Sequence, residues 1–212
     1  RGALRKGSRI TAATQLLTYS DMTIFENRGR RTLNEASTVE EFLGLRADLG
    51  AFALGSYFAE LLETVSAEEY PDPPVLQLGL NSLYALSRAL CPPEQIKAVF
   101  ELRLMCLAGY EPDLSCCARC GAPEPAEPWL SLRGGAVYCA HCRGASSSAV
   151  TPLLPETLAA MRHVVNADPK KIFSFTLGDA GRRQLARVCE EYTAMQLERG
   201  FASLDYWKKV KD

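Results

Sequence analysis

Two closely spaced cysteine pairs constrain this chain more than any other feature of its sequence. Each pair has the pattern Cys-x-x-Cys, and eighteen residues separate the two pairs. This spacing is typical of a four-cysteine zinc ribbon, in which two tight knuckles close a tetrahedron with Zn–S bonds of about 2.3 Å. Gly121 follows the first pair and Gly134-Gly135 precede the second, which provides the backbone freedom that knuckles and a hairpin need. The sequence therefore predicts one structural Zn²⁺ per chain with the ligands Cys117, Cys120, Cys139 and Cys142.

Disulfide bonds and a redox-active pair are the alternative interpretations of these cysteines. The chain has 212 residues, of which 47% are apolar, so it can bury a core without disulfide staples. It has neither the apolar run of about 18 residues that a membrane helix needs nor a charged-then-apolar leader, which predicts a cytoplasmic protein with reduced thiols. Cys116 or His141 could replace a neighbouring ligand. Cys91, Cys106 and Cys189 fall in apolar helical patterns and are expected to be buried thiols.

Residues 109–150, which contain both pairs, predict a small module of loops and hairpins. This stretch holds five of the eight cysteines and four prolines, and it shows little helical periodicity. It has too few apolar residues to form a core of its own. Because helical patterns flank it on both sides, we expect the module to be an insertion into a helical domain.

Hydrophobic periodicity predicts helices over much of the remaining chain. The capping-box spacing of Ser37 and Glu40 predicts a helix that begins near Ser37. Further helices are expected over 75–90, from the Pro92-Pro93 pair to about 107, from 155, and from 179 to about 200. Before Ser37, polar and apolar residues roughly alternate over 8–26 and a turn signal follows at 27–29, which predicts two short strands.

The net charge of −1 hides an uneven distribution of charge along the chain. Residues 1–33 carry seven basic and two acidic side chains, whereas residues 34–90 carry two basic and nine acidic ones. Basic side chains on strands and turns suit a groove that follows the phosphates of a nucleic acid. The predicted DNA-binding residues are Arg1, Arg5, Lys6, Arg9, Arg28, Arg30 and Arg31.

Two aromatic residues and a second basic cluster have more than one interpretation. The rings of Tyr19 and Phe25 could stack on bases, or they could fill the inner face of a small barrel. Arg182, Arg183 and Arg187 lie on the last long predicted helix. They are a possible contact for an acidic peptide or for a second DNA strand, and otherwise they form a solvated helix face.

Sequence signatures of common catalytic sites are absent. The chain has no Gly-x4-Gly-Lys phosphate loop, no Gly-x-Gly-x-x-Gly, no His-Glu-x-x-His and no Gly-x-Ser-x-Gly motif. Neither of the two histidines, His141 and His163, belongs to the His-x-Glu motif of a zinc deaminase. Because groups for acid–base chemistry are so few, we expect a binding protein and not an enzyme.

A run of motifs between residues 100 and 142 matches one known family. It comprises Phe-Glu-Leu-Arg-Leu at 100–104, Gly-Tyr-Glu-Pro-Asp-Leu at 109–114, Cys-x-x-Cys-Gly at 117–121, and Ser131 with Gly134-Gly135 before the second pair. This run resembles the RecO family of bacterial DNA repair proteins. The resemblance implies an α+β fold, mostly α, in three parts. These are a partial N-terminal OB-fold barrel in 1–34, a helical domain in 35–108 and 151–212, and a four-cysteine zinc ribbon inserted at 109–150.

The barrel that the resemblance implies has too little sequence to be complete. An OB fold has five strands, and only about 33 residues precede the first predicted helix. We therefore expect about two strands of the barrel to be absent from this chain.

The resemblance also implies a function in recombination. Proteins of this family are mediators of the RecF pathway that bind single- and double-stranded DNA and anneal complementary strands. With RecR they help to load RecA onto DNA covered by single-strand-binding protein, whose acidic C-terminal tail they contact. This implies a location in the bacterial cytoplasm, associated with the nucleoid, and no membrane partner. The alternative is an adaptor that binds proteins, carries a structural ribbon and does not bind DNA.

Overall fold

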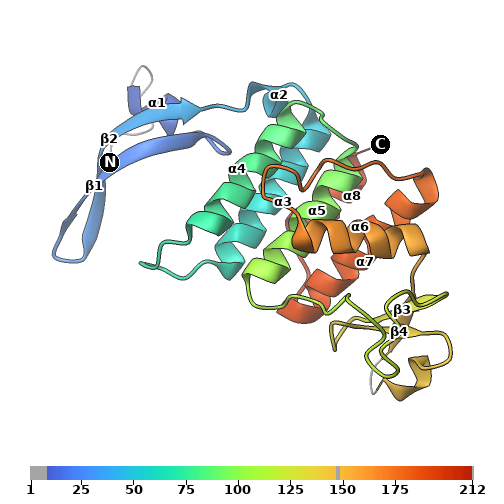
Figure 1. The fold of residues 1–212 in the computed structure, drawn as a ribbon. Coiled ribbons are helices and arrows are strands. Elements are labelled where there is room, and N and C mark those ends of the chain that lie inside the picture. Colours follow the sequence, from blue (N-terminus) through green and yellow to red (C-terminus); the bar gives the residue numbers. More distant parts are fainter. Residues whose placement is uncertain (1–8, 147–148, 212) are drawn as a thin grey trace.

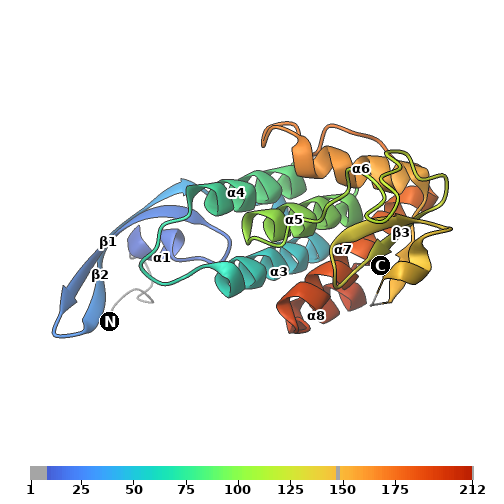
Figure 2. The same ribbon diagram turned by 60° about the horizontal axis from the view of Figure 1, so that its bottom comes forward.

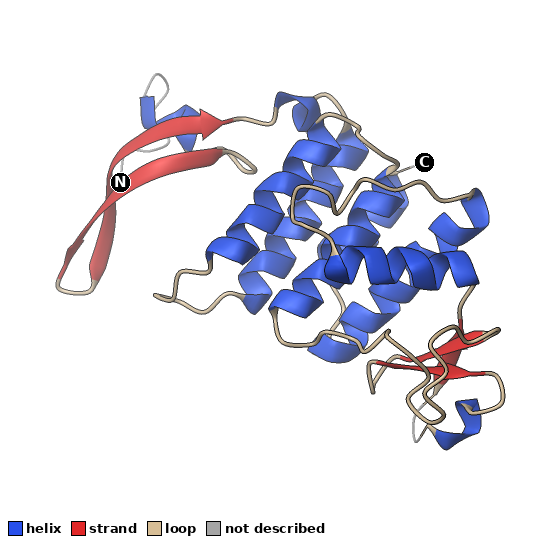
Figure 3. Ribbon diagram, in the orientation of Figure 1, coloured by secondary structure: helices blue, strands red, loops and turns tan. Residues whose placement is uncertain are grey.

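A bundle of helices forms the main body of the protein, with a two-stranded hairpin at one end and a small three-stranded sheet at the opposite end (Figure 1; Figure 3). The computed structural model describes residues 9–146 and 149–211, with the side chain of Arg9 left out. The elements are α1 (Arg9–Ala13), β1 (Tyr19–Asn27), β2 (Arg30–Glu40), α2 (Leu43–Arg46), α3 (Leu49–Val65), α4 (Pro73–Ser87), α5 (Pro93–Leu107), β3 (Pro128–Ser131), β4 (Ala136–Cys139), the 3-10 helix η1 (Arg143–Ala145), β5 (Val150–Pro152), α6 (Pro155–Asn166), α7 (Asp179–Leu197) and α8 (Ala202–Val210).

Helix α5 lies at the centre of the bundle and is buried on every side. It packs against α3, α4, α6 and α7, and Figure 2 shows it between α4 and α3. The side chains of Ile96, Val99 and Leu104 are 0% exposed. The ring of Phe100 stacks on that of Phe58 from α3 with 4.2 Å between the centroids. A helix that is covered all round forms the core of its domain. Among the residues that the structure describes, we find no helix with an apolar stretch of the length needed to span a membrane.

Capping residues and prolines define the ends of the bundle helices. The carboxylate of Asp48 accepts a hydrogen bond from Ala51 N at 2.7 Å and caps α3. Asp72 caps α4 in the same way through Val75 N, at 3.1 Å. Helix α5 begins with proline and ends before Gly109, whose φ of 88° is the left-handed conformation that stops a helix. The helices predicted over 75–90 and up to residue 107 are confirmed, as are those from 155 and 179.

Two elements near the N-terminal end differ from those predicted. A helix does not begin at Ser37, which lies in β2 and pairs with Asp21 of β1. Glu40 does not close a capping box, because its carboxylate accepts a hydrogen bond from Phe42 N at 3.0 Å. Pairing with a neighbouring strand outweighs the local capping pattern here, as tertiary context often does. In addition, α1 occupies the place of the first expected strand.

The β1–β2 hairpin projects from the bundle and is largely exposed (Figure 1; Figure 2). The strands are antiparallel, and Arg28 and Gly29 at the turn both have positive φ, 50° and 74°, as in a type I′ turn. Apolar side chains on the hairpin are open to solvent, including Ile24 at 57% and Phe25 at 61%. Within the described residues this sheet has two strands and does not close into a barrel.

The three-stranded sheet has the order β4-β3-β5 and shares the core of the bundle. Its strands are antiparallel, with Leu130 of β3 paired to Val137 of β4. Both of these side chains are 0% exposed and belong to the same apolar cluster as the bundle helices. The sheet, which is too small to form a core of its own, therefore relies on the bundle for its hydrophobic support.

A charged network lies inside the bundle around α5. The Lys97 ammonium lies 3.0 Å from the Glu101 carboxylate and 2.9 Å from that of Glu190 on α7, and it donates to Ala186 O at 3.1 Å. The Tyr57 hydroxyl of α3 donates to Glu101 at 2.8 Å. Burial acts to lower the pKa of Lys97, but the Glu101 and Glu190 carboxylates outweigh it and raise that pKa above its ordinary value. Lys97 is therefore a buried cation that the surrounding carboxylates stabilise.

Replacing Lys97 by methionine is expected to lower the free energy of unfolding by about 3–5 kcal/mol, because the buried Glu101 carboxylate loses its cation. Urea denaturation followed by circular dichroism measures the change. Lys208→Met is the matched control, because Lys208 pairs with Glu190 from an exposed position and should cost at most about 1 kcal/mol. Equal losses in the two variants would contradict the prediction.

Candidate metal centre and nucleic-acid interface

The first cysteine knuckle is a tight turn in the loop that leads to β3. Cys117 N donates to Ala122 O and Gly121 N donates to Cys117 O, both at 2.8 Å. Gly121 has a φ of 72°, a left-handed conformation that glycine adopts without steric cost. Ala118 N donates to Val137 O at 2.8 Å, so the knuckle is fastened to β4.

The second knuckle follows directly from β4. Cys139 is the last residue of that strand, and Cys142 N donates to Cys139 O at 2.9 Å as the chain turns into η1. Cys139 N donates to the Cys117 sulfur at 3.4 Å, which joins the two knuckles. The pairing of β3 with β4 thus determines where the second pair of thiols meets the first.

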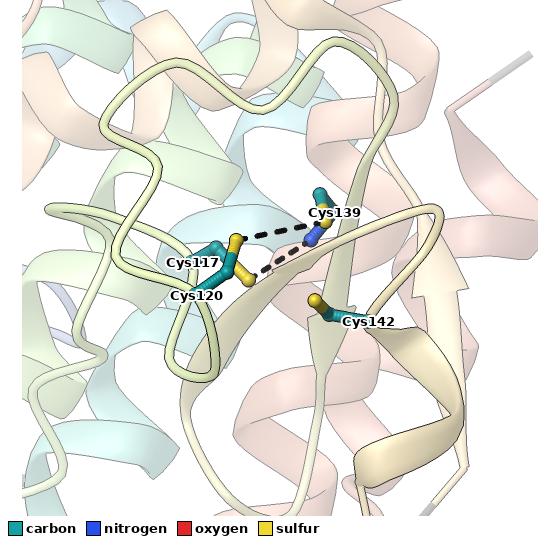
Figure 4. Close-up of side chains that lie close together, drawn as sticks. All are labelled: Cys117, Cys120, Cys139 and Cys142. Carbon is teal, nitrogen blue, oxygen red and sulfur yellow. Dashed lines mark hydrogen bonds between the residues drawn. The ribbon is translucent and has the colours of Figure 1, made fainter.

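The four predicted ligands come together as one cluster (Figure 4). All four sulfur atoms lie within 4.8 Å of one another, and those of Cys120 and Cys139 are 3.9 Å apart. A tetrahedral site with Zn–S bonds of about 2.3 Å has S–S edges of about 3.8 Å, so the spacing fits such a metal ion. All eight cysteines are free thiols, and no disulfide bond joins the pairs. Four sulfur ligands fill a tetrahedron and leave no position for a reactive water.

The thiols of the cluster differ in their acidity. Burial acts to raise the pKa of Cys117, but neighbouring backbone N–H groups, with those of Cys120 and Cys139 foremost, lower it to about 6. The pKa of Cys142 is raised to about 12, mainly by its hydrogen bond with the Cys139 sulfur and secondly by burial. The Cys117 thiol is therefore more acidic than an ordinary cysteine and the Cys142 thiol less acidic, and a bound cation would favour the thiolate form of both.

The remaining cysteines and His141 lie outside the cluster. Cys116 is half-buried beside the first knuckle, and His141 is exposed. Cys189 is 0% exposed, as expected for a buried thiol. Cys91 and Cys106 are only half-buried, and burial raises the pKa of each, to about 11 and about 12.

One arginine of α6 connects the base of the ribbon to the bundle. The guanidinium of Arg162 donates to Leu114 O at 2.7 Å, Ser115 O at 3.1 Å and Pro123 O at 2.7 Å. It also pairs with Glu124 at 2.7 Å. The sequence patterns do not single out this residue, because a lone arginine on an amphipathic helix has no distinctive spacing.

The predicted DNA-binding residues are only partly described. Arg1, Arg5 and Lys6 lie outside the described residues, as does the side chain of Arg9. Arg28 and Arg30 are exposed at the tip of the hairpin and line a shallow hollow together with Phe25. The structure thus brings two cations and an open aromatic ring together at one place.

The other candidate residues have more local contacts. Arg31 pairs with Glu26 across the hairpin at 3.1 Å, and it also contacts two carboxylates from the bundle. Tyr19 is half-buried and packs against the core, whereas the Phe25 ring is open to solvent. On α7, Arg182 pairs with Asp179 at 2.7 Å and Arg187 pairs with Glu191 at 3.3 Å, while Arg183 is exposed.

These features define a helical protein with a small sheet module whose four clustered cysteines could hold a metal ion, and with an exposed hairpin that carries arginines at its tip. The family described as "Recombination protein O C terminal" matches residues 46–205. The DNA repair protein RecO of Acetivibrio thermocellus is 31% identical over 210 residues, which is 99% of this chain and 83% of that protein. The RecO protein of Heliobacterium modesticaldum is 31% identical over 197 residues, covering 90% of this chain and 70% of that protein. The chain belongs to the RecO family of DNA repair proteins, which confirms the resemblance seen in the sequence.

Replacing Cys142 by serine is expected to remove most of the bound metal, because three thiolates leave the tetrahedron incomplete. Elemental analysis of purified protein measures the effect, and the wild-type protein is expected to hold about one ion per chain. Cys116→Ser is the matched control and should retain the metal, since this thiol lies outside the cluster. Metal that persists in Cys142→Ser, or is lost from Cys116→Ser, would show that the ligand set is different.

Proposed function

We propose that this protein is a DNA-binding mediator of recombinational repair that works without catalysing a reaction of its own. The observation that carries the proposal is the exposed hairpin tip, where Arg28, Arg30 and the open Phe25 ring lie together. Cations that contact phosphates, combined with a ring on which a base can stack, form a site for single-stranded DNA. The similarity to DNA repair proteins of the RecO family supports a role in DNA repair.

The proposed division of the chain follows from this function. We assign the hairpin to an incomplete OB-type barrel, a fold that binds oligonucleotides on its strands. We place its boundary at residue 40, where β2 ends. The helical domain then comprises 41–108 and 151–212, and the ribbon is inserted at 109–150.

The metal of the ribbon is proposed to be zinc. A cluster of four thiols with tetrahedral spacing is the ligand set typical of structural Zn²⁺. Cys117, Cys120, Cys139 and Cys142 would hold it, and the ion would join the two knuckles at the end of β4. Its contribution is to folding, because binding the ion also orders the loops that carry its ligands.

The proposed partners extend beyond single-stranded DNA. They are double-stranded DNA, RecR, and the acidic C-terminal tail of single-strand-binding protein, for which the exposed Arg183 on α7 is a candidate contact. Annealing of complementary strands and help in loading RecA would follow from holding DNA beside these proteins. The proposed location is the bacterial cytoplasm, in association with the nucleoid.

Replacing Arg28 and Arg30 together by alanine is expected to weaken binding to single-stranded DNA and to reduce its salt dependence. Fluorescence anisotropy with a labelled oligonucleotide, repeated at several salt concentrations, measures both effects. Each phosphate contact contributes about −0.7 to the slope of log K against log salt for single-stranded DNA. The slope of the double variant should therefore be shallower than that of wild type by about 1.4.

The matched control removes two exposed cations outside the hairpin. Arg133→Ala combined with Lys209→Ala changes the net charge by the same amount and should leave the slope nearly unchanged. If wild-type affinity did not vary with salt, or if the two double variants behaved alike, the hairpin would not be the DNA site. The protein-binding adaptor would then be the better interpretation.

A further inference from the structure

Three carboxylates surround the guanidinium of Arg31. Its nitrogens lie 3.1 Å from Glu26, 2.6 Å from Glu68 and 3.2 Å from Glu69. Glu26 is the cross-strand neighbour of Arg31 within the hairpin. Glu68 and Glu69, by contrast, belong to the loop that joins α3 to α4. Arg31 therefore connects the hairpin to the helical bundle.

The α3–α4 loop is placed to make this connection. Both views show it extending from the bundle towards the hairpin (Figure 1; Figure 2). Glu69 has a φ of 68°, a left-handed conformation that is unfavourable for a residue other than glycine. With the backbone in this conformation, adjacent carboxylates of the loop reach the same guanidinium.

The neighbouring arginines of the hairpin differ from Arg31 in their contacts. In the part of the chain that the structure describes, neither Arg28 nor Arg30 forms an ion pair. The pKa of Arg31 is raised above its ordinary value, mainly by the hydrogen bond to the Glu68 carboxylate and secondly by that to Glu26. Among these three candidates for a phosphate contact, Arg31 is thus the one that carboxylates of its own chain already occupy.

Carboxylates and phosphates compete for the same guanidinium geometry. Both anions accept paired N–H donors from arginine, and phosphate is a partner that arginine binds well. The side chains of Glu68 and Glu69 are 78% and 76% exposed. Ion pairs this exposed are weak and exchange readily, so a DNA phosphate can replace them.

We propose that Glu68 and Glu69 are an internal competitor for DNA: they hold Arg31 while the protein is free, and a DNA phosphate displaces them on binding. This inference rests on the proposed DNA-binding function of the hairpin. Arg28 and Arg30 make the first contacts, and Arg31 adds its contact once the loop has been displaced. DNA binding and release of the hairpin from the α3–α4 loop are then the same event.

The test uses E68Q/E69Q, which removes the competing charges and keeps the size of the side chains. We expect this variant to bind a labelled single-stranded oligonucleotide about 3- to 10-fold more tightly than wild type at low salt. The gain should shrink as salt screens the exposed pairs. E63Q/E127Q is the matched control, because it removes two exposed carboxylates outside the Arg31 cluster, and its Kd should change less than about 2-fold.

A double-mutant cycle with R31A separates direct competition from a general effect of charge. The gain from E68Q/E69Q should disappear when R31A is also present. A gain that persists with R31A would overturn the inference, because the carboxylates would then act on DNA through the overall field of the protein. An unchanged Kd in E68Q/E69Q would overturn it as well, while wild-type DNA binding would leave the proposed function intact.

A measurement without DNA tests the contact itself. Amide hydrogen exchange at residues 26–32 should be faster in E68Q/E69Q than in wild type, since the hairpin loses its link to the loop. Unchanged exchange would show that these ion pairs do not hold the hairpin, and it would overturn the inference. Absence of DNA binding by wild type and both glutamine variants would overturn the proposed function and this inference together.

Discussion

The pairing of Lys97 with Glu101 inside α5 is the interaction on which the helical body depends. Removing such charges from water costs several kcal/mol per ion, and hydrogen bonds from neighbouring helices must offset that cost. The partners come from α3 through Tyr57 and from α7 through Glu190. A different packing of these helices would leave a buried charge without a partner, so the network specifies how they fit around α5.

The ribbon depends on this body as much as on its cysteines. Leu130 and Val137 complete the apolar cluster of the bundle, so the sheet that carries the second knuckle is anchored by hydrophobic contacts. The first knuckle is fastened to β4 beside Val137, and Cys139 N donates to the Cys117 sulfur. Hydrophobic contacts with the bundle and hydrogen bonds between the knuckles thus both support the cluster of four thiols.

Sequence patterns predicted the parts of the molecule that local spacing determines. Cys-x-x-Cys repeats placed the thiol cluster, and prolines with hydrophobic periodicity placed α4, α5, α6 and α7. They failed at Ser37, where strand pairing with a distant residue outweighed a capping pattern. They also missed the contacts of Arg31 with Glu68 and of Arg162 with Leu114, which join residues 37 and 48 positions apart. A sequence shows that such charges exist, whereas only the fold shows which of them meet.

The four hydrogen bonds from Arg162 have a mechanical consequence. They tie the chain on both sides of the first knuckle, at 114–115 and at 123–124, to a single side chain of α6. The position of this knuckle is therefore coupled to that of α6, which itself packs against α5. A substitution of Arg162 would release both flanks of the knuckle at once while leaving its cysteines in place.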